Sequence, residues 1–325
     1  MVNKGNRASL IRRYGIFIIL VVLVLGLCIF CPPFRTFTNI RNVLRQVSIN
    51  GILAVGMTFV ILTGGIDLSV GSLVALAGVT VGIQIGFQNV SVAAGTVNTS
   101  SVALAILSAL AVCSLAGFIN GWMISTFGIP EFVATMAMQT IARGAALLIA
   151  SGQQFIITDE KFKYIGQGMV GPIPVPVILL ALVLLVAGVI LHCTVFGRRV
   201  IAVGGNRKAS EASGISYKKT IRWVYTISGF FAGLAGIVLT SRISAGQPSG
   251  GASYEFKAIT AVVIGGTSLS GGSGSIVGTI IGMLMVGLLS NGMTLLNIDA
   301  YLQQIVEGVV IALAVILDTT SKRKA

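Results

Sequence analysis

Long apolar runs recur along the whole chain, and they constrain its fold more than any other feature. A transmembrane α-helix needs about 20 mostly apolar residues, and ten runs approach this length, the eighth being the shortest. They are approximately Ile16–Phe30, Val47–Leu62, Val70–Phe87, Val102–Thr126, Phe132–Ala150, Val175–His192, Trp223–Ser241, Phe256–Ile264, Ile276–Gly292 and Leu302–Leu317. The sequence therefore predicts an all-α polytopic membrane protein with about ten transmembrane helices and glycine-rich interruptions.

The composition excludes an ordinary soluble protein. Of the 325 residues, 55% are hydrophobic and 10% are charged, whereas about 25% of the residues of a soluble domain are charged. The polar segments between the apolar runs are too short to fold separately, so we expect residues 1–325 to form one transmembrane domain. The first run leads into CPPF rather than a small-residue cleavage site, which predicts a retained helix.

Lysine and arginine gather at the ends of the apolar runs and predict the topology. The N-terminal tail, the segment 194–222 and the C-terminal tail hold 14 of the 22 basic residues. With ten helices these segments share one side of the membrane, and an excess of basic residues marks the cytoplasmic side. We therefore expect both termini in the cytoplasm. Because the charges cluster in this way, the net charge of +13 does not indicate nucleic-acid binding.

Three arginines fall on the opposite side in this topology: Arg35, Arg41 and Arg45. They lie in or beside TFTNIRNVLRQVS, residues 36–48, in which apolar residues recur at helical spacing. One interpretation is a separate amphipathic helix at the membrane surface.

The chain lacks the residues of a catalytic or metal site. No G-x-x-x-x-G-K-[ST] phosphate-binding loop occurs, so the chain is not expected to hydrolyse nucleotide itself. His192 is the only histidine, and the four cysteines lie in or beside apolar runs. Cys28 and Cys31 have C-x-x-C spacing, but no second Cys/His pair lies near them in sequence. A metal site and a histidine-centred general base are therefore not expected. The sequence argues against an enzyme and predicts no cofactor bound by this chain.

Charged residues inside the membrane usually mark ion or proton pathways. The candidates are Asp67, Glu131, Arg143 and Glu307. Arg143 and Glu307 lie well inside predicted helices and could pair. Without further carboxylates to relay a proton, a structural pair is favoured. A transporter of a small neutral solute that is driven by an ion gradient remains an alternative, as does a structural or channel subunit.

Two glycine-rich stretches resemble each other: GGIDLSVGS at residues 64–72 and GGTSLSGGS at residues 265–273. Each lies between consecutive apolar runs, and both fall on the cytoplasmic side, so the match does not indicate an inverted repeat. Glycine permits a tight or unwound connection at membrane depth. We expect structural hinges there, with Asp67 capping the helix that follows. The hinge residues are Gly64, Gly65, Gly265 and Gly266.

The predicted cytoplasmic segment 194–222 contains a short helix signal. In NRKASEASGI, Asn206 is a candidate N-cap and Gly214 a candidate C-terminal stop,. A short exposed helix with small side chains can be held in a groove of a partner protein. The alternative is a basic linker with an incidental helical turn.

Three separated motifs resemble one family. GMTFVILTGGIDLSVGS, AVGGNRKASEASGI and AITAVVIGGTSLSGGSGSIVGTIIG together resemble the membrane permeases of bacterial ABC importers for ribose and related monosaccharides. The resemblance implies location in the bacterial inner membrane, a second permease subunit, identical or different, and a periplasmic sugar-binding protein. It also implies a cytoplasmic ATPase that uses ATP and Mg²⁺ and grips this chain. The implied coupling residues are Gly205, Asn206, Ala209, Glu211, Ala212, Gly214 and Ile215.

A path for a neutral sugar is expected to carry small and neutral polar side chains. Weak candidates are Asn50, Asn120, Asn291, Gln303 and Gln304. Because amides in membrane helices more often bond to neighbouring helices, the substrate-binding residues stay unassigned.

Overall fold

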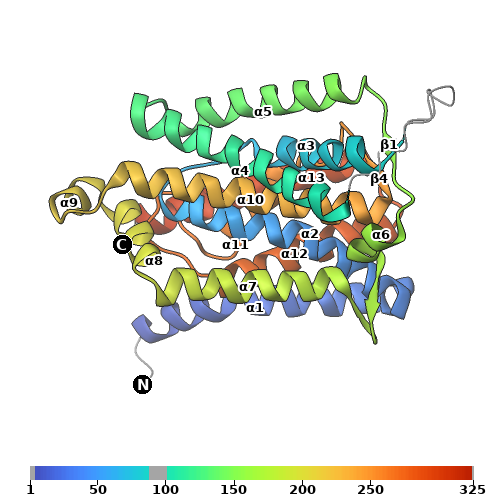
Figure 1. Cartoon of the computed structure of the whole chain (residues 1–325). Helices are drawn as coiled ribbons and strands as arrows, with labels where there is room; N and C mark the ends of the chain where they lie inside the picture. The colour runs from blue at the N-terminus through green and yellow to red at the C-terminus, as the bar shows by residue number, and fades with distance from the viewer. Residues whose placement is uncertain (1–3, 88–100, 324–325) are drawn as a thin grey trace.

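The computed structural model describes residues 4–87 and 101–323, which form a bundle of α-helices aligned roughly along one axis (Figure 1). The longer helices are α1 (Lys4–Phe30), α2 (Phe37–Leu62), α4 (Val102–Phe127), α5 (Glu131–Ile149), α7 (Val175–Cys193), α10 (Tyr217–Ile243), α12 (Ile276–Leu295) and α13 (Ala300–Arg323). The shorter ones are η1 (Pro32–Arg35), α3 (Val70–Ile85), α6 (Glu160–Gln167), α8 (Val195–Gly205), α9 (Arg207–Ala212) and α11 (Tyr254–Ile264).

Each of the ten predicted apolar runs lies in a helix. Within the described residues, six helices are long and apolar enough to cross a membrane: α2, α4, α5, α7, α10 and α12. Three further apolar stretches are shorter: Phe17–Phe30, Val70–Ile85 and Ala300–Ile316. The all-α polytopic class is therefore confirmed, whereas the count of about ten spans stays a prediction, since six helices meet the length and composition of a span.

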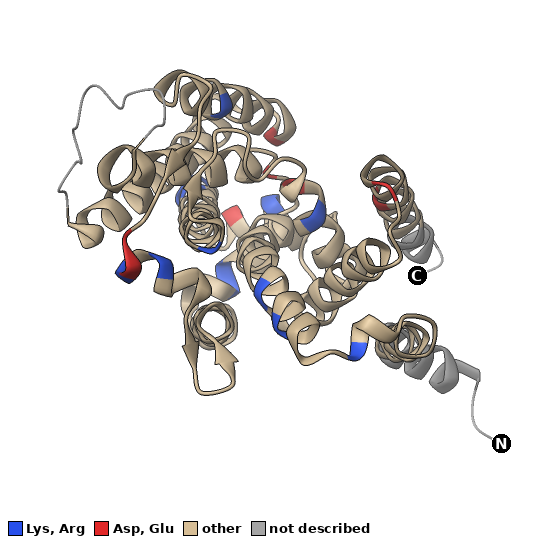
Figure 2. Cartoon of the chain, turned by 90° about the vertical axis from the view of Figure 1, so that its right-hand side faces the viewer, with Lys and Arg blue, Asp and Glu red and all other residues tan. Residues whose placement is uncertain are grey.

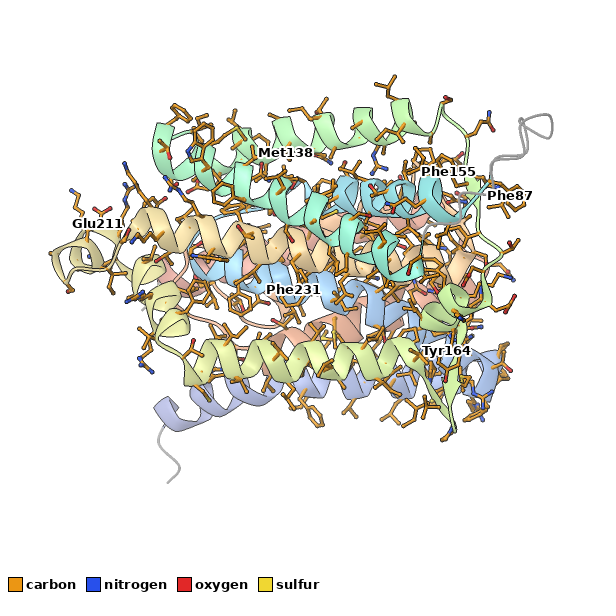
Figure 3. The ribbon with its side chains drawn as sticks, in the orientation of Figure 1. Phe87, Met138, Phe155, Tyr164, Glu211 and Phe231 are labelled. Carbon is orange, nitrogen blue, oxygen red and sulfur yellow. The ribbon has the colours of Figure 1, made fainter. Side chains whose placement is uncertain are left out.

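Helices α2 and α10 form the centre of the bundle. Within their most apolar windows, 83% of the residues of α2 and 78% of those of α10 are buried, against 28% in each of α4, α5 and α7. The two central helices pack closely because Gly56 of α2 lies against Ser228 and Phe231 of α10; Phe231 is labelled near the middle of Figure 3. The outer helices expose apolar side chains, as a lipid environment requires.

The helix expected over residues 36–48 is present but is not separate, because residues 37–48 are the start of α2. Thr36 caps the helix by accepting a hydrogen bond from the Asn39 N–H. The polar residues of the segment bond within the bundle. Asn39 exchanges two amide hydrogen bonds with Asn291 of α12, at 3.1 and 3.0 Å, and Arg45 donates to the Gln167 carbonyl at 2.8 Å.

Helices α3 and α11 are half-length and occupy opposite halves of the bundle, right and left in Figure 1. An irregular segment precedes each of them: residues 63–69 lead from α2 to α3, and residues 244–253 lead from α10 to α11. The starts of the two half-helices meet, since Gly71 of α3 packs against the backbone of Gly251. Helix α10 packs on α3 and α4, and α2 packs on α11 and α12. Each central helix therefore packs on a half-helix and a long helix from the other half of the chain.

The right-hand end of Figure 1 is closed by short elements between the helices. Strands β1 (Phe155–Ile156) and β4 (Ala245–Gly246) pair with each other, as do β2 (Met169–Val170) and β3 (Ile173–Pro174). Helix α6 is joined to the end of α10, because the Ser241 hydroxyl donates to the Phe162 carbonyl at 2.6 Å and accepts from the Gly166 N–H at 2.7 Å. Figure 2 looks onto this end of the bundle.

Candidate functional site

Helices α8 and α9 form a projection at the opposite end of the bundle, here called the knob (residues 195–214; Figure 1). Asn206 ends α8 in an extended conformation, and its side chain accepts a hydrogen bond from the Ala209 N–H at 3.0 Å, so it is the N-cap of α9. Gly214 follows the C-cap with a φ of +80°. The N-cap and the glycine stop expected from the sequence are both confirmed.

The predicted coupling residues are displayed on this knob. Six of them are exposed and Ile215 is half-buried; the exposed ones are Gly205, Asn206, Ala209, Glu211, Ala212 and Gly214. Figure 3 shows Glu211 beyond the end of the bundle. The knob is held to α10, since the Arg207 guanidinium lies 3.7 Å from the centre of the Tyr217 ring. Within α9, Arg207 also pairs with Glu211 at 3.3 Å. The surface is therefore accessible and also fixed to the bundle.

Three backbone segments meet where the knob joins the rest of the bundle. We call them the glycine junction: residues 62–65, 204–205 and 270–272. The Gly272 N–H donates to the Leu62 carbonyl at 2.9 Å. A Cβ on Gly204 would collide with that same carbonyl. Gly271 has a φ of +80° and packs on Gly204, a conformation and a proximity that favour glycine,. The end of α8 therefore contacts the end of α2 directly through the backbone of Gly204 and Leu62.

The two similar glycine-rich stretches are adjacent at this junction. Gly64 has a φ of +84° and lies against Ser270. Gly65 leaves room for the Tyr225 hydroxyl, and Gly265 packs on the backbone of Gly278 in α12. Gly266 has a φ of +87° and is exposed. Sequence reasoning did not assign Gly204, Gly271 and Gly272 to the contact, although the doublets at 204–205 and 271–272 were a usable signal.

Asp67 is fully buried and ties the segment before α3 to α10. Its carboxylate accepts from the Ser69 N–H at 3.0 Å, the Ser69 hydroxyl at 2.6 Å and the Ser228 hydroxyl at 2.7 Å. Asn120 of α4 donates to the Ser69 hydroxyl at 3.0 Å. The expected cap on the first turn of α3 is not formed, because the helix begins at Val70 and the carboxylate reaches only the N–H of the N-cap residue.

Asp67→Ala is expected to lower the free energy of unfolding by about 3 kcal/mol, because buried donors lose a charged acceptor. Asp67→Asn should lower it less, since its amide oxygen still accepts from Ser69 and its NH₂ can donate to Ser228. Thermal unfolding of the purified proteins in detergent measures both effects. Equal melting temperatures of Asp67→Ala and the wild type would show that this network does not stabilise the bundle.

Arg143 and Glu307, which were expected to pair, bind different partners. Arg143 of α5 donates to the carbonyls of Pro248 and Gly250 at 2.7 and 2.9 Å. Glu307 of α13 pairs with Lys257 of α11 at 3.1 Å. The prediction is wrong because α13 packs on α11, whereas Arg143 faces the irregular segment before α11.

Another buried carboxylate lies close to Arg143 and had no signal in the sequence analysis. Glu255 of α11 is 4% exposed and accepts from the Gln139 amide at 3.1 Å. Gly71, at the start of α3, packs on its second carboxylate oxygen. The side chains of α5 therefore hold the starts of both half-helices.

The five amide candidates for the path mostly bond within the bundle. Asn291 pairs with Asn39, Asn120 donates to Ser69, and Gln303 donates to the Ile298 carbonyl at 2.8 Å. Asn50 is buried and Gln304 is exposed. No three His, Cys, Asp or Glu side chains in residues 4–87 and 101–323 lie close enough together to hold a metal ion.

Comparisons with known proteins connect this geometry to transport. Residues 39–315 match the family model described as the branched-chain amino acid transport system / permease component. The chain is 43% identical over 312 residues to the ribose import permease protein RbsC of Bacillus subtilis (strain 168), covering 95% of this chain and 94% of that protein. It is 42% identical over 305 residues to RbsC of Escherichia coli (strain K12), covering 93% and 92%.

A relative named for another sugar is also similar. The L-arabinose transport system permease protein AraH of Escherichia coli (strain K12) is 35% identical over 306 residues, covering 94% of this chain and 90% of AraH. No solved structure matches the chain. The chain therefore belongs to the branched-chain amino acid transport system / permease component family.

Proposed function

We propose that this chain is the inner-membrane permease subunit of an ATP-driven importer of a ribose-like monosaccharide. The observation that carries the proposal is the exposed knob joined by the glycine junction to the central helix α2. Such a device can transmit movement of a bound protein into the bundle. The relatives named as ribose import permeases supply the substrate class.

The knob is the surface that a cytoplasmic ATPase would bind. Its exposed face combines the small side chains of Ala209 and Ala212 with basic residues such as Arg207 and Lys208, and a short exposed helix fits a groove on a partner. ATP and Mg²⁺ are assigned to the ATPase, because the chain has no phosphate-binding loop. Movement of the knob would pass from Gly204 to Leu62, and so to α2.

The orientation follows from the position of the knob. Helix α1 begins and α13 ends at the knob end of the bundle (Figure 1), and the basic segment 194–222 lies there too. The positive-inside rule therefore puts this end and both termini in the cytoplasm. The opposite end, with α6 and the paired strands, is then the surface for a periplasmic sugar-binding protein.

A second permease subunit would cover the face where the chain is irregular at membrane depth. Ser249 and Ala252 are exposed and non-helical, and Arg143 bonds to the same segment six residues before α5 ends at Ile149. At about 1.5 Å per residue this is about 9 Å inside the end of the helix. Irregular backbone at this depth is tolerated only beside protein or water, so the path and the subunit contact are assigned to this face.

Cysteine labelling tests this assignment. In a variant lacking the four native cysteines, Ala252→Cys is expected to react with a membrane-impermeant maleimide in the assembled transporter, at a rate that changes with the nucleotide state. Leu185→Cys on α7, where the leucine is 64% exposed, is the matched control and should stay unlabelled in lipid. Equal labelling of the two cysteines would contradict a path at Ala252, and so would the absence of labelling at both positions in all nucleotide states.

An importer driven by an ion gradient is the second candidate, and one observation favours it. Two opposed half-helices that meet beside a buried carboxylate, Glu255, resemble the broken helices of ion-coupled transporters,. The exposed knob has no role in that mechanism, and so we prefer the hypothesis of an ATP-driven importer.

Uptake of labelled sugar tests the substrate class. Cells that lack their own ribose permease and express this chain with its ATPase and binding protein are expected to accumulate ribose, and unlabelled ribose should compete. Leucine is the control solute, because the family description names branched-chain amino acids. Leucine uptake without ribose uptake would overturn the assignment to sugars.

A further inference from the structure

A groove runs between α4 and α10 on the outside of the bundle, near the knob end. These two helices lie side by side at the front of Figure 1. The groove has a volume of about 540 Å³. Its lining consists of Ser114, Leu115, Phe118, Lys219, Arg222, Trp223 and Thr226. None of these residues belongs to the glycine junction or to the irregular segment 244–253.

The lining of the groove changes from basic to largely apolar with depth, as a phospholipid changes from an anionic headgroup to apolar acyl chains. Lys219 and Arg222 lie in the first two turns of α10, which begins at Tyr217, whereas Thr226 is nine residues from that start. Nine residues span about 14 Å, close to half of a hydrocarbon core of about 30 Å. Leu115 and Phe118 provide apolar walls deeper in the membrane. The groove therefore has a basic mouth at the interface and, about one leaflet deep, walls formed by Leu115 and Phe118 beside the hydroxyls of Ser114 and Thr226.

The positive charge at the mouth has no acidic partner in the described part of the chain. Arg222 donates to the hydroxyls of Ser125 and Thr126, at 3.2 and 3.0 Å, and both of these are neutral. The ion pairs found among the side chains of residues 17–87 and 101–316 involve other basic residues, namely Lys163, Arg207 and Lys257. The two hydroxyls hold the guanidinium in place beside the groove, with donors left over for an anion.

We propose that this groove binds one anionic phospholipid from the leaflet at the knob end of the membrane. The phosphate lies between Lys219 and Arg222, and an acyl chain lies along Leu115, Phe118 and Trp223. Basic pockets between membrane helices bind anionic headgroups, and a zwitterionic lipid would bring its own cation next to two fixed positive charges. The proposal requires only that the bundle spans a membrane, so it does not depend on the substrate or on the energy source.

The two tryptophans of the chain make the site directly measurable. They are Trp122 and Trp223, so Trp122→Phe leaves the groove residue as the sole tryptophan. The full-length variant is reconstituted into liposomes that contain phospholipids with brominated chains, which quench nearby tryptophan. Brominated phosphatidylglycerol is expected to bind beside Trp223 about thirtyfold more tightly than brominated phosphatidylcholine, from about 1 kcal/mol for each of two basic side chains.

Matched variants distinguish a specific lipid site in the groove from a general attraction of anionic lipids to the positively charged protein. Lys219→Gln with Arg222→Gln should abolish the preference for phosphatidylglycerol, and Lys219→Gln alone, at an exposed side chain, should lower it to about fivefold. Arg198→Gln with Arg199→Gln removes the same charge from exposed positions on α8 and should leave the preference intact. Equal quenching by both lipids, or an equal loss in the α8 variant, would overturn the proposal. Release of quenching by millimolar inorganic phosphate would also overturn it, as the site would then take a free anion.

Discussion

Ala209→Trp is expected to leave the permease in the membrane but to prevent its ATPase from copurifying with it. Ala209 is exposed on α9 and its side chain supports no buried contact, so the indole projects into the space that the ATPase would occupy. Loss of a central contact in an interface costs about 2 kcal/mol or more, which is about thirtyfold in affinity. Affinity purification through a tag on the permease, together with sugar uptake, measures both consequences.

A deletion within residues 206–214 should have the same effect, whereas Ala111→Trp, at an exposed position of α4, is the control and should retain the ATPase. Substitution of Glu211 should be milder, because its ion pair with Arg207 is at the surface and such pairs contribute about 0–1 kcal/mol. If the ATPase copurified with Ala209→Trp and uptake persisted, the knob would not be the coupling surface.

Gly204→Ala is expected to retain the ATPase and yet to lose most of the sugar uptake. The added Cβ would collide with the Leu62 carbonyl, so α8 must shift away from the end of α2. Overpacking of this kind costs about 1–3 kcal/mol, enough to lower a rate by about fivefold to about 150-fold if the contact must form during each cycle. The surface of α9 is unchanged, which is why binding of the ATPase should survive.

Gly188→Ala is the matched control for this substitution. Gly188 lies inside α7, and a Cβ there would meet nothing within 4 Å, so uptake should equal that of the wild type. Uptake, ATPase copurification and thermal unfolding are measured on the same preparations. Full uptake by Gly204→Ala would show that the glycine junction does not transmit movement, even if the knob binds the ATPase.

The helices and the knob were predictable because their signals are local. Apolar runs give the positions of helices directly, and Asn206 and Gly214 set the ends of α9 through bonds and backbone angles within a few residues. The partners of single charged residues were not predictable in this way. Whether Arg143 meets Glu307 or a carbonyl depends on which helices are neighbours, and helical spacing reports burial but not the identity of a neighbour.

The two irregular segments show the same limit. The glycine match correctly located two non-helical connections at one end, whereas their action as hinges stays a prediction. The counterpart of the segment before α3 is residues 244–253, which does not resemble it in sequence. Its signal was only PSGG, residues 248–251, a common turn composition. That this turn lies inside the bundle is set by the packing of α10 on α3, with Gly71 against Gly251. For the same reason, the polar residues of 36–48 indicated a helix at the membrane surface, because the sequence does not show that Asn39 bonds to the distant Asn291.

The source of energy tests the central claim most directly. Labelled ribose uptake is measured in intact cells that contain the permease, its ATPase and its binding protein, with the proton gradient and the ATP level controlled separately. Uptake should continue after the proton gradient is collapsed while ATP is maintained, and should stop when the ATPase carries an inactivating substitution. Uptake that is abolished by collapse of the gradient alone, and that is indifferent to the ATPase, would contradict an ATP-driven permease.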